Sequence, residues 1–240
     1  MNKKLYFISD LHLGLQSKQE EAEKEEVLVN FLHSINVTGN ELFILGDLFD
    51  YWFEYNRVYQ KGFFRTFTAL DDLVKNGVVV HYIIGNHDFV HKNFFEKELN
   101  IKLYPDSISK NINGTNFFLA HGDGMVENDF GYTILKFILR NKFLQFLYSL
   151  IHPDLAIKIA SGASKKSRNH SAKKNKIEKD GLVDSAQKKI DEGFNYVIFG
   201  HLHKRNIHKY KNGFYINLGS WIEKPCYGLF ENNKFEIIDL

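Results

Sequence analysis

The feature that most constrains this 240-residue sequence is a series of short apolar runs, several of which end abruptly at Gly, Ser or Asp. The runs are rich in Val, Ile, Phe and Tyr, which favour strands. Continuous apolar runs of this length are typical of strands buried on both faces of a sheet. They comprise Leu5–Ile8, Leu42–Leu45, Val78–Ile84, Phe117–Ala120, Val197–Phe199, Tyr215–Leu218 and Phe235–Ile238.

Helical patterns lie between these runs. Glu20–Ile35 opens with acidic residues and then places its apolar side chains on one stripe, and Phe63–Val74 has a similar stripe. Gly181–Glu192 is predicted to be a further helix. The alternation of strands and helices predicts an α/β fold. Because the length lies within the range of one large domain, we expect a single domain over residues 1–240.

Residues 125–180 break the alternation, and we interpret them as a helical insertion within the domain. Phe130–Ile159 is predicted to be helical and is crowded with large apolar side chains, and the basic run Lys165–Lys179 follows it. An apolar helical surface beside a basic run can bind lipid and an anionic surface, including a diphosphate. Alternatively, the apolar faces pack against each other and the sheet, and the basic run is a solvated helix face.

Five short polar motifs each follow an apolar run. Because ligands of open α/β sheets bind at the carboxyl ends of strands, we expect these motifs to converge at one edge. Their carboxylates, imidazoles and one amide suit Mn, Fe, Zn or Mg, without any thiolate. The motifs are Asp10-Leu-His12, Gly46-Asp47, Gly85-Asn86-His87-Asp88, His121-Gly122-Asp123 and Gly200-His201-Leu-His203.

The number and spacing of these ligands fit two metal ions. In Asp10-Leu-His12 the two ligands are two positions apart, so a turn is needed for both to converge, and neighbouring glycines permit such turns. Asp47 is the natural bridging ligand, because a carboxylate can span metals about 3.5–4 Å apart. Each motif alone is more often a turn or a surface pair. Five together predict a dinuclear phosphoesterase site.

In this order, the motifs resemble those of the calcineurin-like metallophosphoesterase superfamily, and the resemblance runs along the whole chain. It implies a four-layer α/β/β/α sandwich with a dinuclear centre, often of manganese. It also implies that His87 acts as general acid or as a donor to the transferring phosphoryl group, with Asp88 orienting it. The ligands that it implies are Asp10, His12, Asp47 and His203 for one metal, and Asp47, Asn86, His121 and His201 for the other.

Within that superfamily, the chain is similar to the UDP-2,3-diacylglucosamine pyrophosphatases of lipid A biosynthesis. The matching segments are Ser9–Leu13, Gly46–Asp50 with Trp52, Asn86–Phe89 and His121–Asp123, together with the insertion. This similarity implies hydrolysis of UDP-2,3-diacylglucosamine to UMP and 2,3-diacylglucosamine 1-phosphate by two divalent ions, most often Mn²⁺, under a lid formed by the insertion. The substrate-binding residues that it implies are Asn86, His87, Asp129, Tyr132 and His201.

One position departs from that family. His87 stands where the lipid A enzymes usually carry Arg, and His can protonate a leaving group whereas Arg offers a fixed charged fork. The departure bears on the substrate more than on the metal site. An alternative is a phosphodiesterase or nuclease that binds a phosphate backbone with the basic run, but the aromatic residues lie upstream in the apolar helices, which favours lipid. A further alternative is a scaffold protein that binds metal but has lost catalysis. Such a protein would be expected to lack some ligands, whereas this sequence retains all seven.

The remaining composition bears on location and partners. A net charge of +2 creates no overall field for nucleic acid, so we expect none as a partner. The single cysteine, Cys226, suits a reducing compartment. The first apolar run is too short for a signal peptide, and no run of about 18 apolar residues occurs. We therefore expect a cytoplasmic protein bound peripherally to the cytoplasmic face of the inner membrane.

Overall fold

A computed structural model of the protein describes residues 3–126, 130–160, 162 and 181–240. It contains two sheets, with the strand orders β11-β10-β1-β2-β3-β4 and β5-β6-β7-β9-β8. The strands of the first sheet are β1 (Leu5–Ile8), β2 (Glu41–Leu45), β3 (Val79–Ile83), β4 (Lys102–Tyr104), β10 (Cys226–Glu231) and β11 (Lys234–Asp239). Those of the second are β5 (Ser107–Ile112), β6 (Thr115–Ala120), β7 (Tyr196–Phe199), β8 (Asn206–Tyr210) and β9 (Gly213–Asn217).

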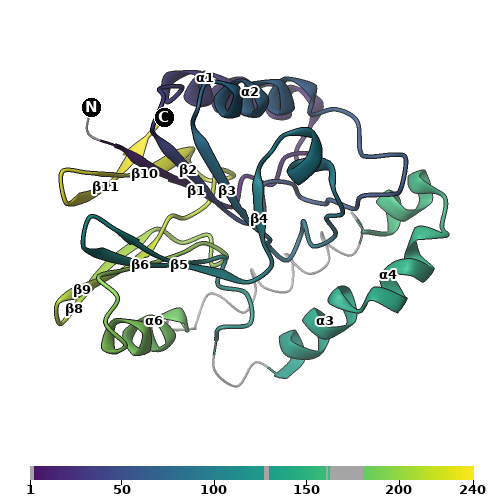
Figure 1. The fold of residues 1–240 in the computed structure, drawn as a ribbon. Helices are drawn as coiled ribbons and strands as arrows, with labels where there is room; N and C mark the ends of the chain where they lie inside the picture. The colour runs from purple at the N-terminus through teal and green to yellow at the C-terminus, as the bar shows by residue number, and fades with distance from the viewer. Residues whose placement is uncertain (1–2, 127–129, 161, 163–180) are drawn as a thin grey trace.

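Helices cover the outer face of each sheet, so the fold has the four layers that the family resemblance implied (Figure 1). Helices α1 (Lys18–Ser34) and α2 (Phe64–Lys75) pack on the first sheet, with Leu32 and Leu70 in one buried cluster with Ile8 and Ile44. Helix α6 (Leu182–Asp191) covers the second sheet. A separate apolar cluster joins the facing sides of the two sheets; it includes Phe7, Phe43, Phe117, Ile198 and Ile216.

Parallel pairing places the carboxyl ends of the central strands on the same side of the molecule. β1, β2, β3 and β4 are parallel neighbours, as are β6, β7 and β9. The loops that follow β1 and β2 then pair with each other, because the N–H of His12 donates to the carbonyl of Asp47 at 3.0 Å and that of Leu13 to Leu48 at 2.9 Å. The loop after β1 is thus held beside the loop after β2.

The insertion is divided into shorter helices than Phe130–Ile159 suggested. Helix α3 (Phe130–Arg140) ends before Asn141, whose side chain accepts from the N–H groups of Phe143 and Leu144 and so begins α4 (Lys142–Ser149). Residues 153–160 form a further helix that begins at a proline. Figure 1 shows α3 and α4 along one side of the sandwich. The basic run Lys165–Lys179 and Asp129 lie outside the described residues.

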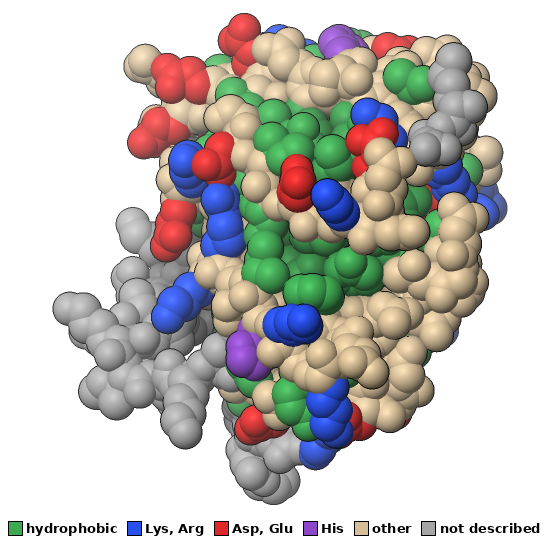
Figure 2. All heavy atoms as spheres, turned by 90° about the vertical axis from the view of Figure 1, so that its left-hand side faces the viewer, with side chains coloured by type: hydrophobic (Ala, Val, Ile, Leu, Met, Phe, Trp, Pro, Cys, Tyr) green, Lys and Arg blue, Asp and Glu red, His purple; other side chains and the backbone are tan. Residues whose placement is uncertain are grey.

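On the side of the molecule away from α4, hydrophobic side chains reach the surface among charged ones (Figure 2). The cluster between the sheets has partly buried members, among them Tyr196, Phe214 and Phe235.

Four strands were not predicted, namely β4, β5, β8 and β10. A short π-helical turn, Phe94–Glu98, was not predicted either.

Candidate active site

The predicted metal ligands come from five strand ends that belong to both sheets. Asp10, Asp47 and Asn86 follow β1, β2 and β3 of the first sheet, whereas His121 and His201 follow β6 and β7 of the second. The site therefore lies where the two sheets meet, and not at one edge of a single open sheet as the strand pattern had suggested. The loops of the second sheet are joined by a bond from the Gly200 N–H to the carbonyl of His121, at 2.9 Å.

Five of the ligand residues have left-handed backbone conformations. Such φ values are uncommon outside glycine and occur mostly where the surrounding structure imposes them. They turn both members of the Asp-x-His and His-x-His pairs towards the same point, as the spacing required. The φ values are 54° for Asp10, 48° for His12, 52° for Asp47, 71° for His201 and 57° for His203.

Two glycines permit the ligand carboxylates to approach the neighbouring backbone. A Cβ atom on Gly85 would collide with the carboxylate of Asp47, and one on Gly200 would collide with the carboxylate of Asp10. In that space the two oxygens of Asp10 accept from the His201 N–H at 3.2 and 3.0 Å. The N–H of His87 donates to Asp47 Oδ1 at 2.9 Å. Both carboxylates are thus fixed by backbone donors.

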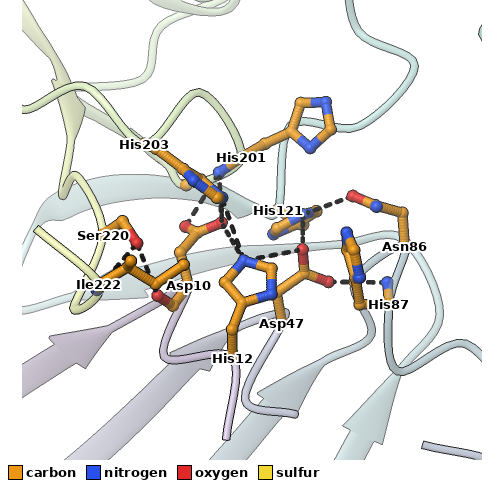
Figure 3. A network of polar contacts seen from close by, with 12 residues as sticks. Asp10, His12, Asp47, Asn86, His87, His121, His201, His203, Ser220 and Ile222 are labelled. Carbon is orange, nitrogen blue, oxygen red and sulfur yellow. Dashed lines mark hydrogen bonds and ion pairs between the residues drawn. The ribbon is translucent and has the colours of Figure 1, made fainter. Parts of the chain in front are cut away.

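One half of the site brings Asp10, His12, Asp47 and His203 together (Figure 3). The Nε2 atoms of His12 and His203 lie 3.0 Å apart. His203 Nε2 is 3.3 Å from Asp10 Oδ1, and His12 Nε2 is 3.7 Å from Asp47 Oδ2. These four residues are the set that the resemblance implied for the first metal.

The other half is centred on His121. Its Nδ1–H donates to the carbonyl of Leu45 at 2.8 Å, which directs Nε2 into the site. Nε2 lies 3.3 Å from Asp47 Oδ2 and 3.0 Å from Asn86 Oδ1. The ring of His201 lies beside that of His121, with 5.0 Å between ring centroids. The set implied for the second metal is therefore gathered around His121, which contacts Asp47 and Asn86 and lies beside the ring of His201.

The charged groups at the centre of the site shift one another's pKa values. Burial alone would raise the pKa of Asp47, but His121, His87 and His12 outweigh it and hold that pKa well below its usual range. Burial would lower the pKa of His121, but Asp47 outweighs it and holds that pKa well above its usual value. Burial and the neighbouring His121 lower the pKa of His201 to about 4, so this ring is neutral at pH 7.

These residues fit divalent metal ions. Asp10 and Asp47 are two carboxylates with at most 1% exposure, and burial of like charges at one point is costly unless cations compensate them. Three groups of potential ligand atoms lie within 4.8 Å of one another: Asp10–His12–His203, His12–Asp47–His87 and Asp10–Asp47–His121. All donors are oxygen or imidazole nitrogen, which suits Mn²⁺, Fe²⁺, Zn²⁺ or Mg²⁺.

His87 lies beside this cluster and is partly exposed, with a side-chain exposure of 14%. Its Nδ1 lies 3.0 Å from the Asp50 carbonyl oxygen, to which it can donate, and 3.6 Å from Asp50 Oδ1. Asp50 Oδ1 also lies 3.4 Å from His12 Nδ1. Asp50 therefore lies between the candidate general acid and a candidate metal ligand.

The resemblance implied that Asp88 orients His87, whereas in the structure Asp50 lies beside the His87 ring and the Asp88 carboxylate contacts other residues. The Asp88 carboxylate accepts from the N–H groups of Leu48 and Gly85, both at 2.8 Å, and from the hydroxyl of Tyr82. It thereby ties the loop after β2 to the loop after β3. Sequence reasoning assigned no role to Asp50, although the motif Gly46–Asp50 contains it and its spacing of three residues from Asp47 was a usable signal.

The predicted substrate residues of the insertion are only partly covered by the structure. Asp129 lies outside the described residues, and Tyr132 lies on α3, where its side chain is not described. Helix α3 is nevertheless linked to the site, because Lys136 Nζ lies 2.9 Å from Asp123 Oδ2 and also contacts Asp106 at 3.5 Å. Asp123 belongs to the same motif as the candidate ligand His121.

Comparison with known proteins agrees with this geometry. Residues 3–205 match the calcineurin-like phosphoesterase family model. Relatives named UDP-2,3-diacylglucosamine hydrolase include one from Porphyromonas gingivalis, which is 34% identical over 72% of this chain and 67% of its own. A relative of the same name from Proteus mirabilis is 32% identical over 97% of both chains. One from Haemophilus influenzae is 30% identical over 91% of both.

Among solved structures, an archaeal phosphodiesterase has the same fold, with a TM-score of 0.50 over 99% of both chains and 15% sequence identity. The family match spans all five motifs, and the matched motifs are the ones that converge on the buried carboxylates of Asp10 and Asp47. The chain therefore belongs to the calcineurin-like phosphoesterase family.

Proposed function

We propose that this protein hydrolyses the pyrophosphate of UDP-2,3-diacylglucosamine to UMP and 2,3-diacylglucosamine 1-phosphate, using two divalent metal ions, most often Mn²⁺. The observation that supports the proposal is the convergence of His12, His121 and His203 on the buried Asp10–Asp47 pair, with Asn86 and the ring of His201 beside His121. The substrate rests on the relatives of that name, which match this chain over most of its length.

The chain's own residues divide the work. Asp10, His12, Asp47 and His203 would hold one ion, and Asp47, Asn86, His121 and His201 the other. When bound, the ions polarise the phosphoryl group and activate water for attack at phosphorus. His87, held at Nδ1 by Asp50, keeps Nε2 available to donate a hydrogen bond or a proton to the phosphate oxygens. Partial exposure of His87 and His203 leaves this side of the site accessible to a substrate.

The insertion supports a lipid substrate. Large apolar side chains on α3, on and just after α4, and on the helix at 153–160 are exposed, and large exposed apolar patches mark binding surfaces. They include Ile134, Phe137, Ile138, Phe143, Leu144, Phe146, Leu147, Leu150, Leu155 and Ile159. None of the helices that the structure describes combines the length and apolar character needed to cross a bilayer. We propose that this surface receives the acyl chains and docks on the cytoplasmic face of the inner membrane.

The first test is hydrolysis of UDP-2,3-diacylglucosamine by protein reconstituted with Mn²⁺, with UDP-glucose as the substrate control and Asp47→Ala as the protein control. We expect UMP release from the lipid substrate by the wild type alone, with UDP-glucose spared. If the protein cleaves an aryl phosphodiester in a metal-dependent manner but releases no UMP, the phosphoesterase remains and the lipid substrate is wrong. Preferential cleavage of oligonucleotides would identify a nuclease.

The membrane proposal is tested by flotation with vesicles that contain anionic lipid. Replacing Phe137, Phe143 and Phe146 with Asp adds charge to the exposed faces of α3 and α4, and we expect it to abolish co-flotation. Phe64→Asp is the matched control, because Phe64 is 79% exposed on α2, away from the insertion. Equal flotation of the wild type and the triple variant would contradict membrane docking through this surface.

A further inference from the structure

Helix α1 carries a buried lysine that contacts the loop holding a candidate metal ligand. Lys24 is 5% exposed, whereas Lys18 at the start of the same helix lies at the surface. The Lys24 ammonium donates to the carbonyl oxygen of His12 at 3.0 Å and to Glu21 Oε1 at 2.9 Å. Burial of an ammonium is costly unless it is paired, so both contacts are needed to keep Lys24 in this position.

Glu21 completes the arrangement from the same helix. Its two carboxylate oxygens accept from the N–H groups of Gly14 and Gln16, each at 2.8 Å. Glu21 and Lys24 therefore make three hydrogen bonds to the loop that follows His12, and the ion pair between them fixes their relative positions. This loop connects β1 to α1, and its conformation decides where the His12 ring points.

His12 is a residue for which such support matters. Its φ of 48° is left-handed, a conformation that its own side chain disfavours and that surrounding contacts must maintain. The peptide that follows it is held by the Lys24 ammonium and by the N–H of Leu15, which donates to the same carbonyl at 3.3 Å. A charged donor makes the stronger of these bonds.

We propose that Lys24, held by Glu21, is a positioning residue that fixes the loop conformation in which His12 binds metal. The inference rests on the metal-dependent activity proposed above, but it does not depend on the identity of the substrate. Lys24 does not reach the reacting atoms in this arrangement. It acts through the carbonyl of His12.

The test compares Lys24→Met with Lys18→Met, which removes an exposed charge from the same helix. Binding of MnCl₂ to metal-free protein is measured by calorimetry without any substrate, and kcat and KM are measured with an aryl phosphodiester over a series of Mn²⁺ concentrations. We expect Lys24→Met to weaken Mn²⁺ binding about 10- to 100-fold, as loss of supporting contacts to metal ligands typically does, and excess Mn²⁺ to restore much of kcat. Lys18→Met is expected to bind Mn²⁺ as the wild type does.

A second variant separates positioning from folding. Glu21→Gln keeps one of the two acceptor oxygens that face the loop and removes the charge that holds the ammonium, and we expect a smaller loss of Mn²⁺ affinity than for Lys24→Met. If Lys24→Met lowers the melting temperature while Mn²⁺ affinity stays at the wild-type value, Lys24 only stabilises the fold and the inference is wrong. If Lys24→Met does not fold, unchanged Mn²⁺ affinity in Glu21→Gln overturns it. Calorimetry gives these outcomes even if UDP-2,3-diacylglucosamine is not the substrate.

Discussion

At the scale of single residues, the metal-ligand positions have disfavoured backbone conformations and very little free space around their side chains. Each left-handed residue such as Asp10 or Asp47 costs of order 1 kcal/mol, which neighbouring contacts must offset. Here the offset comes from backbone bonds between the loops and from carboxylates such as Asp88 that tie one loop to the next. The ligands are therefore placed by the protein chain itself.

Substitution at Gly85 tests this close fit. An added Cβ would lie 2.9 Å from Asp47 Cγ, although the backbone at Gly85 is not left-handed. We expect Gly85→Ala to displace Asp47, to cost about 1–3 kcal/mol of unfolding free energy and to weaken Mn²⁺ binding. Thermal unfolding and calorimetry measure both effects. Gly162→Ala is the control, since its Cβ would meet nothing within 4 Å; equal behaviour of the two variants would refute the steric argument.

Asp50 provides the second test at this scale. Asp50→Asn keeps the shape and the backbone carbonyl but removes the negative charge beside His12 and His87. We expect kcat for an aryl phosphodiester to fall about 10- to 100-fold with KM little changed. Asp72→Asn, an exposed change on α2, serves as the control. An unaltered kcat in Asp50→Asn would show that this carboxylate does not orient the two imidazoles.

At the scale of elements, the insertion is attached to the core by polar contacts near the site and by aromatic packing farther along. Lys136 and Arg140 of α3 contact Asp106, and Lys136 also contacts Asp123. Farther along, the ring of Tyr148 lies 4.9 Å from that of Phe53. The exposed apolar faces between these attachments are free to meet a lipid.

Loss of the ion pairs that attach α3 to the core is expected to lower kcat/KM for UDP-2,3-diacylglucosamine but not for a small substrate. Lys136→Met removes both ion pairs of Lys136, and we expect kcat/KM for UDP-2,3-diacylglucosamine to fall about threefold to tenfold, the scale of a partly buried ion pair. Cleavage of a short aryl phosphodiester, which does not need the insertion, should remain at the wild-type rate. Lys142→Met on α4 is the exposed control. A parallel loss with both substrates would place the effect in the metal site instead.

The elements that could be predicted were those with a continuous apolar pattern. β1 and β7 were predicted within one residue, and α1 begins at a capping box of Ser17 and Glu20 just ahead of the predicted start. β5, with the sequence SISKNI, and β8, with NIHKY, were missed because both are edge strands with exposed polar residues. The breaks in the insertion at Asn141 and Pro153 were visible in the sequence as capping and helix-start signals.

The positions of the candidate ligands at strand ends could be predicted, because these residues form short motifs that each follow a strong strand signal. Contacts between distant segments could not be predicted in this way. The contact of Asp50 with His87 joins residues 37 positions apart, and that of Lys136 with Asp123 depends on how the insertion folds back. The assignment of His121 and Asp10 to different sheets also needed the three-dimensional structure.

At the scale of the whole molecule, a buried charge cluster joins the two sheets at the end of β2 opposite the metal site. Glu41 is 3% exposed and contacts Lys3, Lys110 of β5 and, at 3.1 Å, His81 of β3. His81 Nδ1 also lies 3.0 Å from the hydroxyl of Tyr104. Lys110 comes from the second sheet and Glu41 from the first, so their contact crosses the sandwich.

This cluster predicts a loss of stability in acid. Burial would raise the pKa of Glu41, but His81, Lys110 and Lys3 outweigh it and lower that pKa far below 4.5, so the stabilisation exists above about pH 4.5 and is lost below it. Burial lowers the pKa of His81 below 6.5, despite the opposing contact with Glu41, so unfolding is also favoured as pH falls below 6.5.

Melting temperatures measured from pH 7 to pH 3 check this expectation. We expect the wild type to lose stability below pH 6.5 and more steeply below pH 4.5, and Glu41→Gln to be less stable at pH 7 but to lose less on acidification. Glu96→Gln, at an exposed position, should follow the wild-type curve. Parallel curves for Glu41→Gln and the wild type would assign the acid sensitivity to other groups.

The placement of the ligands on both sheets has a consequence for how the protein is handled. Ions bound between loops of the first and second sheets would act as removable cross-links, and by thermodynamic linkage they stabilise only the folded chain. Free metal at 100 times its dissociation constant adds about 2.7 kcal/mol per site to the free energy of unfolding. A chelator used in purification would therefore remove catalysis and, in the same step, loosen the junction between the two halves of the sandwich.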